Sequence, residues 1–221
     1  MKPTATAVPE TDHSGNTGDA ILQAAVELFA LRGYHATSMR DIAAAVDVRA
    51  AGIYHWYPSK ETILITLQDA FIADLTTEVV AAIDRHRRSE TRMASAVREH
   101  VVFHGLNTQS AFVTDSEIRA LSPRNRKSLV AKRDAYQDLF ISLIDDGVKA
   151  GVFSVSEVRI AAYAILLECT GVALWFDPAG ERTLDEVAEI HIELVLGSLG
   201  ANRRTIASAI RATRNSAPSP A

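Results

Sequence analysis

The sequence predicts an all-α protein, and three observations carry the prediction. Apolar residues recur at helical spacing through most of the chain, and no alternating strand pattern longer than a few residues interrupts them. Capping residues, glycines and prolines stand where those periodic stretches begin and end. At 221 residues and 48% hydrophobic content, the chain is also long enough to bury one large core or two small ones.

The first helix is predicted over residues 21–32, where apolar residues follow the i, i+3, i+4 rule. Thr17 is its expected N-cap, and Gly33 stands where a residue in the left-handed conformation commonly ends a helix. A second, short helix begins after Ser38. Because Asp41 follows Ser38 by three residues, the pair resembles a capping box with Asp in place of Glu.

A third short helix begins at Val48 and must end by Tyr57, because Pro58 disfavours helical geometry at the residue before it. Ser59 then caps a longer fourth helix, which extends over residues 60–88. The N-terminal part of the chain is therefore expected to contain two short helices between two longer ones. The fourth helix carries one apolar stripe, formed by Ile63, Leu64, Leu67, Phe71, Leu75 and Val79.

The remainder of the chain keeps the helical period. We expect further helices at residues 93–107, 114–121, 123–151, 156–176 and 183–199. The last two are apolar over most of their length and contain small residues that permit close packing. The chain then ends in a basic stretch without an acid, which we expect to be largely disordered and which contains Arg203, Arg204, Arg211 and Arg214.

Composition narrows the class of protein. Lys and Arg number 23 against 27 Asp and Glu, so any affinity for nucleic acid must be local. The first eighteen residues lack the apolar core of a signal peptide, and no later stretch approaches eighteen uncharged apolar residues. Cys169 is the single cysteine and lies in an apolar run, which favours a buried side chain over a disulfide or a redox sensor. These features predict a cytoplasmic protein without a membrane anchor.

The order of the first helices is typical of a helix-turn-helix. Two short helices with a turn at Asp47–Val48 follow a longer bracing helix, and in such units the second short helix enters the major groove of DNA. The second short helix contains most of the stretch "GIYHWYPSKE". Helical spacing divides its aromatic and large apolar residues into two sets. We expect one set to point inward (Ile53, Trp56 and Tyr57) and the other to point toward solvent or phosphate (Tyr54 and His55).

The stretch "TSMRDIAAAVDVRAAGIYHWYPSKETIL" resembles the DNA-binding domain of TetR-type transcriptional regulators. Their pattern runs Thr, a few residues, Ile-Ala, then Val, then Leu/Ile-Tyr-x-x-Phe/Tyr-x-Ser-Lys-Glu, and the resemblance covers about residues 21–71. It implies a TetR-like fold, with an N-terminal three-helix DNA-binding domain and a C-terminal helical domain for ligand binding and dimerisation. It also implies that seven residues contact phosphates or bases, namely Thr37, Ser38, Arg40, Arg49, Tyr54, His55 and Lys60.

Two departures from the family pattern bear on how DNA would be read. Arg49 stands where the family often has a Ser or Thr cap, and small residues replace the commoner polar ones at positions 50–52. Base readout is therefore expected to depend on Arg49, Tyr54 and DNA shape.

The segment from Asp19 to Lys60 carries no net charge. Four basic residues, Arg32, Arg40, Arg49 and Lys60, balance four acidic residues, Asp19, Glu27, Asp41 and Asp47. A neutral monomer binds DNA weakly, which predicts a homodimer on a pseudo-palindromic operator.

The resemblance implies four segments. A disordered tail is expected at residues 1–17, the helix-turn-helix domain at 18–63, the effector-binding and dimerisation domain at 64–200, and the basic, largely disordered tail at 201–221. In the family, the last two helices form a four-helix bundle across the two-fold axis. The alternative is that these helices belong to the core of the monomer.

The effector class follows from a looser likeness to TetR-type regulators of fatty-acid, sterol or aromatic catabolism that respond to acyl-CoA thioesters. Such a ligand needs an apolar tunnel and nearby cations. An uncharged lipophile, as sensed by regulators of drug efflux, is the alternative ligand, and ordinary helical core is the alternative role for the rings. The expected pocket residues are Phe103, His104, Arg119, Arg133, Tyr136, Phe140 and Trp175.

Other chemistry finds little support in the sequence. His100 and His104 stand four residues apart on a predicted helix, yet no HExxH motif surrounds them and no acidic third ligand is identifiable. GxSxG, P-loop and GxGxxG patterns are absent, and the only Glu-x-x-His, at Glu10–His13, lies in the expected tail. We therefore predict a ligand-responsive transcriptional regulator, most often a repressor in this family, with no metal or cofactor and no enzymatic activity.

Overall fold

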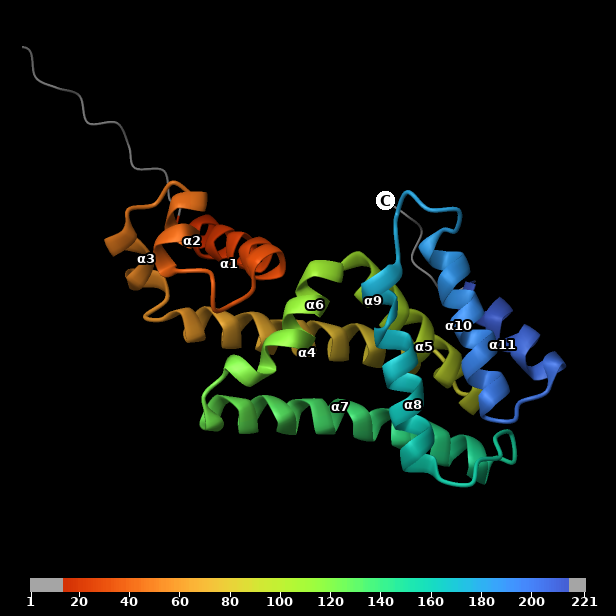
Figure 1. Cartoon of the computed structure of the whole chain (residues 1–221). Coiled ribbons are helices and arrows are strands. Elements are labelled where there is room, and N and C mark those ends of the chain that lie inside the picture. Colours follow the sequence, from red (N-terminus) through yellow and green to blue (C-terminus); the bar gives the residue numbers. More distant parts are fainter. Residues whose placement is uncertain (1–13, 215–221) are drawn as a thin grey trace, which may run out of the picture. The chain divides into compact units, whose positions relative to one another are not determined.

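The computed structural model describes residues 14–214, without the side chains of residues 14–16, and every regular element in that range is helical (Figure 1). The all-α prediction is confirmed. The outer parts of the two predicted tails, residues 1–13 and 215–221, lie outside the described residues. Contacts divide the chain into two units between Ile63 and Leu64, and this boundary falls inside helix α4.

The first unit contains α1 (Ser14–Arg32), α2 (Met39–Ala45) and α3 (Ala50–Trp56). Helix α1 begins inside the tail predicted for residues 1–17 and ends as predicted at Gly33, whose φ of 82° lies in the left-handed region. The Gly33 N–H donates to the Phe29 carbonyl at 2.9 Å, which closes the last turn. The three helices share a small core of fully buried side chains, namely Ile21, Ala25, Phe29, Ile42 and Ile53.

The connections around α2 fix the angle of α3. The predicted capping box is present: the Asp41 N–H donates to the Ser38 hydroxyl, and the Ser38 N–H donates to the Asp41 carboxylate at 2.8 Å. At the other end Asp47 has φ 53°, although it is not a glycine. The N–H groups of Asp47 and Val48 donate to carbonyls of the last turn of α2, and α3 begins at Ala50 after a connection of four residues, 46–49.

The second unit is a bundle built around α5. This helix buries eleven of its eighteen residues and packs against α6, α7, α8, α9, α10 and α11, so it has almost no exposed face. Helix α7 begins at the predicted Pro123, and α10 begins after Thr183, which forms a capping box with Glu186. The elements are α4 (Lys60–Asp84), α5 (Ser89–Leu106), α6 (Thr108–Ser116), the 3₁₀ helix η1 (Glu117–Ala120), α7 (Pro123–Lys149), α8 (Val158–Thr170), α9 (Val172–Trp175), α10 (Leu184–Ser198) and α11 (Arg203–Arg214).

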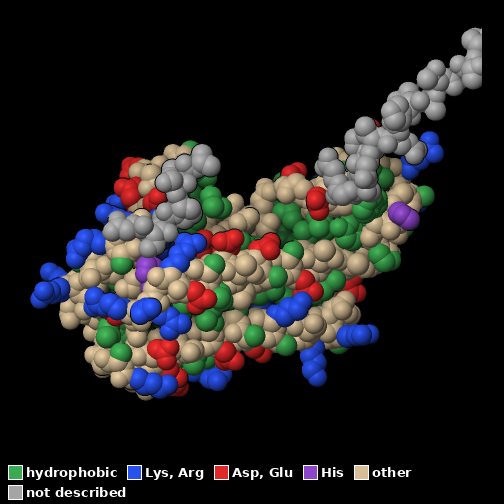
Figure 2. Space-filling model, turned by 180° about the vertical axis from the view of Figure 1, so that it is seen from behind, with side chains coloured by type: hydrophobic (Ala, Val, Ile, Leu, Met, Phe, Trp, Pro, Cys, Tyr) green, Lys and Arg blue, Asp and Glu red, His purple; other side chains and the backbone are tan. Residues whose placement is uncertain are grey.

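Helix α11 corrects the expectation of a largely disordered tail from residue 201. Asn202 accepts a hydrogen bond from the Thr205 N–H at the start of the helix. Ala209, Ile210 and Thr213 are buried where α11 packs against α5 and α10. The arginines occupy the opposite side, and Figure 2 shows Lys and Arg side chains gathered over the end of the unit that carries α10 and α11. Burial of one narrow apolar stripe therefore orders a segment whose composition is basic.

A single helix expected over residues 156–176 is divided at Gly171 into α8 and α9. Among the described residues, the segment Val158–Trp175 is the one helical stretch long and apolar enough to cross a membrane, with a mean hydropathy of 1.5. That criterion uses length and composition alone, and helices that pack against protein also meet it. Only 22% of this segment is buried in the chain, so its exposed apolar side chains need another explanation.

Replacing Asp47 by valine is expected to lower the free energy of unfolding by about 1–2 kcal/mol, because a β-branched residue is strained in the left-handed region. Asp47→Asn is the matched control, since Asn tolerates this conformation, and it should change stability by less than about 0.5 kcal/mol. Urea unfolding followed by circular dichroism measures both variants. Equal destabilisation by the two substitutions would contradict a role for the backbone conformation at this turn.

Candidate nucleic-acid interface and effector cavities

The rings of α3 are divided between the inside and the outside of the first unit, as the helical spacing predicts. Ile53 is fully buried, and Trp56 and Tyr57 are half-buried against α1. The Tyr57 hydroxyl donates to the Gly18 carbonyl at 3.4 Å, and a Cβ added to Gly18 would lie 3.2 Å from the Trp56 ring. Partial burial raises the pKa of Tyr57, so its hydroxyl stays protonated and available as a donor. The aromatic residues thus hold α3 on α1.

The outer side of α3 is open to solvent. Tyr54 exposes 52% of its surface and His55 is also exposed. Arg49 directly precedes α3 without capping it, and Arg40 is exposed on α2. Ser38 is exposed too, but its hydroxyl is engaged with Asp41. Among the residues predicted to contact DNA, Arg40, Arg49, Tyr54 and His55 are therefore exposed, and their side chains form no hydrogen bond within residues 14–214 that would compete with such a contact.

Two residues that the resemblance assigns to DNA contact, Thr37 and Lys60, form hydrogen bonds within the protein. The Lys60 Nζ donates to the carbonyls of Tyr34 at 2.5 Å and Thr37 at 2.6 Å, and it lies 4.2 Å from the centre of the Tyr34 ring. The Thr37 side chain is buried, and its hydroxyl donates to the Gly33 carbonyl at 3.0 Å. Lys60 therefore fastens the start of α4 to the loop that follows α1.

A central cavity of about 170 Å³ lies within the second unit and combines apolar walls with several polar side chains. His100 and His104 are buried on successive turns of α5, and their rings stack at 4.2 Å. The His100 Nδ1 lies 2.8 Å from the Tyr136 hydroxyl, and its Nε2 lies 3.0 Å from the Thr170 hydroxyl. The cavity is lined by Phe71, Ile72, Leu75, His100, His104, Thr114, Asp115, Arg133, Tyr136, Gln137, Leu166 and Thr170.

Burial sets the protonation of this cluster. It lowers the pKa of His100 well below its usual value, with the neighbouring His104 acting in the same direction, and it lowers the pKa of His104 as well. Burial also raises the pKa of Tyr136 well above its usual value. Both imidazoles are therefore neutral at pH 7. The His104 Nδ1 lies 2.8 Å from the His100 carbonyl, which places its single proton on Nδ1.

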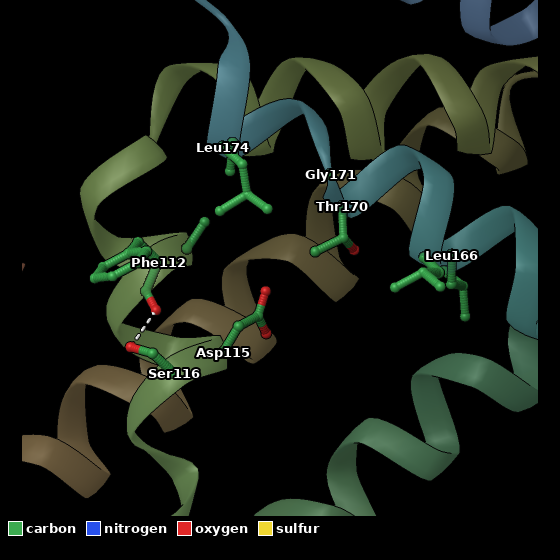
Figure 3. Close-up of a pocket in the computed structure, with 10 residues that line it drawn as sticks. Phe112, Asp115, Ser116, Leu166, Thr170, Gly171 and Leu174 are labelled. Carbon is green, nitrogen blue, oxygen red and sulfur yellow. Dashed lines mark hydrogen bonds between the residues drawn. The ribbon is translucent and has the colours of Figure 1, made fainter.

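Two wider cavities share residues with the central one. The first, which we call the α6–α8 cavity, measures about 550 Å³ and is lined by residues of α6, α8 and α9 (Figure 3). Asp115 and Thr170 extend into it from opposite walls, and both residues also line the central cavity. The second, the α4–α7 cavity, measures about 610 Å³ and shares Ile72 and Tyr136 with the central cavity. The α6–α8 cavity alone is within the size range of sites that hold a lipophilic ligand.

Both parts of the sequence match one family of regulators. Residues 21–67 match the bacterial regulatory proteins of the tetR family, and residues 86–199 match the tetracyclin repressor-like C-terminal domain. The chain belongs to the TetR family. Members of this family are transcriptional regulators and not enzymes, so the prediction of a non-enzymatic regulator is confirmed.

Individual relatives agree with the TetR assignment over most of the chain. The HTH-type transcriptional repressor KstR2 of Rhodococcus jostii strain RHA1 is 28% identical over 200 residues, which is 86% of this chain and 96% of that protein. A crystal structure of a tetR-family regulatory protein from Rhodococcus RHA1 is 30% identical with a TM-score of 0.80, covering 84% of this chain and 97% of the other. The crystal structure of AibR in complex with isovaleryl coenzyme A and operator DNA shares the fold, with 22% identity, a TM-score of 0.74, and coverage of 80% and 96%.

The residues expected to form the effector pocket of this TetR protein divide into three groups. His104, Arg133 and Tyr136 line the central cavity. Phe103 and Phe140 pack behind it, with ring centres 5.1 Å from Phe71 and 5.5 Å from Tyr136 respectively. Asp115 and Thr170 also line the cavity, but no sequence motif distinguishes them, because only the packing of α6 and α8 brings them there.

Two of the expected pocket residues, Arg119 and Trp175, line none of the three cavities. Arg119 is exposed on η1, and Trp175 exposes 58% of its surface on α9, where its ring stacks on His191 at 6.2 Å. The histidine pair considered as metal ligands also has other partners, because both nitrogens of His100 are hydrogen-bonded to hydroxyls. Within residues 14–214, no group of three or more His, Cys, Asp or Glu side chains is placed to hold a metal ion.

Helix α8 is apolar on two sides. Its inner stripe is Ala162, Ile165 and Cys169, and burial raises the pKa of the Cys169 thiol, in keeping with the predicted role of a buried small hydrophobe. The outer stripe is exposed and continues onto α9 and α10. This surface, which we call the outer apolar face, consists of Ile160, Tyr163, Leu167, Leu174, Trp175, Ile190 and Leu194. An isolated soluble chain rarely exposes so many large apolar side chains on neighbouring helices.

Lowering the pH from 7.5 to 5 is expected to reduce the free energy of unfolding. His100 and His104 have lowered pKa values in the folded protein, so the unfolded chain takes up protons as the pH falls through about 6.5 while the folded chain does not. Each histidine contributes at most about 1.4 kcal/mol per pH unit. Urea unfolding at several pH values measures the slope.

The matched comparison is His104→Asn, whose amide retains a donor near the Nδ1 position but does not titrate. Its slope should be shallower than that of the wild-type protein. Glu99 has a pKa raised by burial and acts in the opposite direction, but its contribution is common to both proteins. An identical slope in the variant would show that His104 is not buried in its neutral form.

Proposed function

We propose that this TetR-family protein is a cytoplasmic, ligand-responsive repressor that binds a pseudo-palindromic operator as a homodimer and is released by a small lipophilic effector such as an acyl-CoA. One observation carries the proposal. Helix α4 begins at Lys60, which is held in the helix-turn-helix unit, and the same helix supplies Phe71, Ile72 and Leu75 to the wall of the central cavity. A ligand in the cavity therefore contacts the helix to which the DNA-binding unit is attached.

DNA binding in this proposal depends on few charges. Arg40 and Arg49 are exposed, whereas the Lys60 ammonium is bonded to carbonyls inside the unit. Counterion release scales with the number of phosphates neutralised, so one protomer binds weakly and the salt dependence is shallow. Two protomers on half-sites roughly 34–36 Å apart supply the missing affinity.

The outer apolar face is the proposed dimer interface. It lies on α8, α9 and α10, which include the two helices that the resemblance assigns to dimerisation. Small residues such as Ala161 and Ala164 stand beside its larger side chains on α8 and permit close approach of a second copy. Pairing this face with itself across a two-fold axis removes its apolar side chains from water.

The effector acts by shifting a population. A ligand releases DNA only to the extent that it binds the DNA-free conformation more tightly than the DNA-bound one. The AibR structure, which contains isovaleryl coenzyme A and operator DNA, supports an acyl-CoA as effector, and the repressor KstR2 supports repression as the direction of control. The alternative effector is an uncharged lipophile of the kind sensed by regulators of drug efflux, which the apolar α6–α8 cavity would also accept.

Arg49→Ala and Tyr54→Ala should each weaken operator binding by about 1–3 kcal/mol per half-site, and Arg49→Ala should also reduce the salt dependence. Operator duplexes are first enriched from a random pool with the wild-type protein, and affinities are then measured by fluorescence anisotropy, with and without decanoyl-CoA. Arg126→Ala, an exposed arginine on α7, is the control and should bind as the wild type does. Unchanged affinity in both α3 variants would remove α3 as the recognition helix.

Leu167→Glu is expected to convert the homodimer to monomers, because it places a carboxylate in the middle of the outer apolar face. Size-exclusion chromatography with light scattering measures the mass. Val130→Glu adds the same charge at an exposed apolar residue of α7 and should leave the dimer intact. A Leu167→Glu protein that remains dimeric would place the interface elsewhere.

A further inference from the structure

Three side chains in the central cavity form a hydrogen-bonded series in which the donor protons outnumber the hydrogen bonds by one. The series runs from the Tyr136 hydroxyl through the His100 imidazole to the Thr170 hydroxyl, over distances of 2.8 and 3.0 Å. Neutral His100 carries one N–H, and each hydroxyl carries one O–H. Three protons therefore serve two hydrogen bonds, and one hydroxyl proton is left over.

The tautomer of His100 decides which hydroxyl keeps the extra proton. If the proton is on Nδ1, His100 donates to Tyr136 and accepts from Thr170, so the Tyr136 O–H is directed elsewhere. If the proton is on Nε2, the roles reverse and the Thr170 O–H is directed elsewhere. In neither case does another described residue take the remaining proton, because these two hydroxyls form no further hydrogen bond within residues 14–214.

Both hydroxyls belong to cavity walls. Tyr136 lines the central cavity and the α4–α7 cavity, and Thr170 lines the central cavity and the α6–α8 cavity. Burial keeps His100 neutral, so protonation of the imidazole does not remove the surplus donor at pH 7. A buried donor without a partner costs free energy, and an acceptor atom on a ligand offsets that cost.

The charges around these cavities favour a neutral acceptor. Arg133 donates to the Thr114 carbonyl at 2.8 Å and to the Asp115 carboxylate at 3.3 Å. Lys132, which lines the α4–α7 cavity, pairs with Asp69 at 2.7 Å. With these cations paired and both histidines neutral, a buried carboxylate would pay for its desolvation without a cation of its own, whereas a carbonyl oxygen needs only the hydroxyl donor.

We propose that the central cavity binds the neutral carbonyl oxygen of a lipophilic effector through the surplus hydroxyl proton of the Tyr136–His100–Thr170 series. The apolar remainder of the ligand occupies the α6–α8 cavity, whose walls include Phe112, Leu166 and other apolar side chains (Figure 3). The volume of about 170 Å³ accommodates the carbonyl and the atoms next to it, and the wider cavity accommodates the chain. This inference rests on the proposed function, because it names the chemical group by which the effector is recognised.

The test compares two probes that differ by one oxygen. Decanoyl-CoA contains a thioester carbonyl, and S-decyl-CoA has a methylene group in its place. Isothermal titration of the full-length protein should show that the thioester binds about tenfold more tightly, which is the contribution of one hydrogen bond to a buried donor. In a Tyr136→Phe/Thr170→Val double variant, the ratio should fall toward one while the affinity for the thioether is unchanged.

A matched variant separates the series from the general effect of removing a buried hydroxyl. Ser95→Ala removes a buried hydroxyl of α5 that lines none of the three cavities, and it should retain the tenfold ratio. Tyr136→Phe and Thr170→Val alone identify the donating hydroxyl, and hence the tautomer. Unaltered affinity for S-decyl-CoA shows that a variant is folded, and if the double variant does not fold, the wild-type ratio and the single variants still decide.

Three results would overturn the inference, and they are distinguishable. Equal binding of both probes to the wild-type protein would remove carbonyl recognition and leave an acyl-CoA effector standing. A tenfold ratio that persists in the double variant would place carbonyl recognition on other residues. Binding of neither probe would remove the acyl-CoA effector itself, and with it this inference.

Discussion

The contact between Lys60 and two backbone carbonyls is the interaction on which the proposed coupling of DNA and effector depends. A carbonyl without a donor is costly inside a protein. In the loop after α1 the Tyr34 carbonyl accepts the Thr37 N–H at 3.3 Å, and the carbonyls of Tyr34 and Thr37 both accept from the Lys60 side chain. The ammonium satisfies both and thereby fixes the first turn of α4. Helix α4 is continuous from Lys60 to Asp84, so in the proposed mechanism one helix connects the cavity wall to the Lys60 contact.

Local features of the fold were predictable from the sequence because neighbouring residues determine them. The Ser38–Asp41 capping box and the left-handed Gly33 need only the chain within one turn. Helix α11 was missed for the opposite reason: four arginines dominate its composition, and it is ordered only because Ala209 and Ile210 pack against α5 and α10. Sequence periodicity over twelve residues cannot reveal whether a partner surface exists for so narrow a stripe.

The effector site was predictable only in part, because a cavity is made by tertiary packing. The looser resemblance and its rings predict Tyr136 for the pocket, and the i, i+4 spacing of His100 and His104 suggests a metal site, but no sequence pattern indicates the hydrogen bonds of His100 to two hydroxyls. Trp175 is predicted for the pocket by the same resemblance and by its aromatic ring. It lies instead on the outer apolar face, where a large ring is useful for association.

To release DNA, the effector must prefer the DNA-free conformation by more than one hydrogen bond can supply. Reversing an equilibrium from 99:1 to 1:99 takes a preference of about ten-thousand-fold, and a homodimer with two cavities divides this into about a hundredfold for each ligand. The hydrogen bond from the surplus hydroxyl proton supplies about tenfold of this preference when it forms in the DNA-free conformation alone. The remaining tenfold corresponds to roughly 55 Å² of apolar surface buried in one conformation and not in the other, at about 25 cal/mol per Å². The apolar walls of the α6–α8 cavity that lie outside the proposed dimer interface, among them Phe112 and Leu166, provide that surface, so the carbonyl selects the ligand and its hydrocarbon part supplies the rest of the shift.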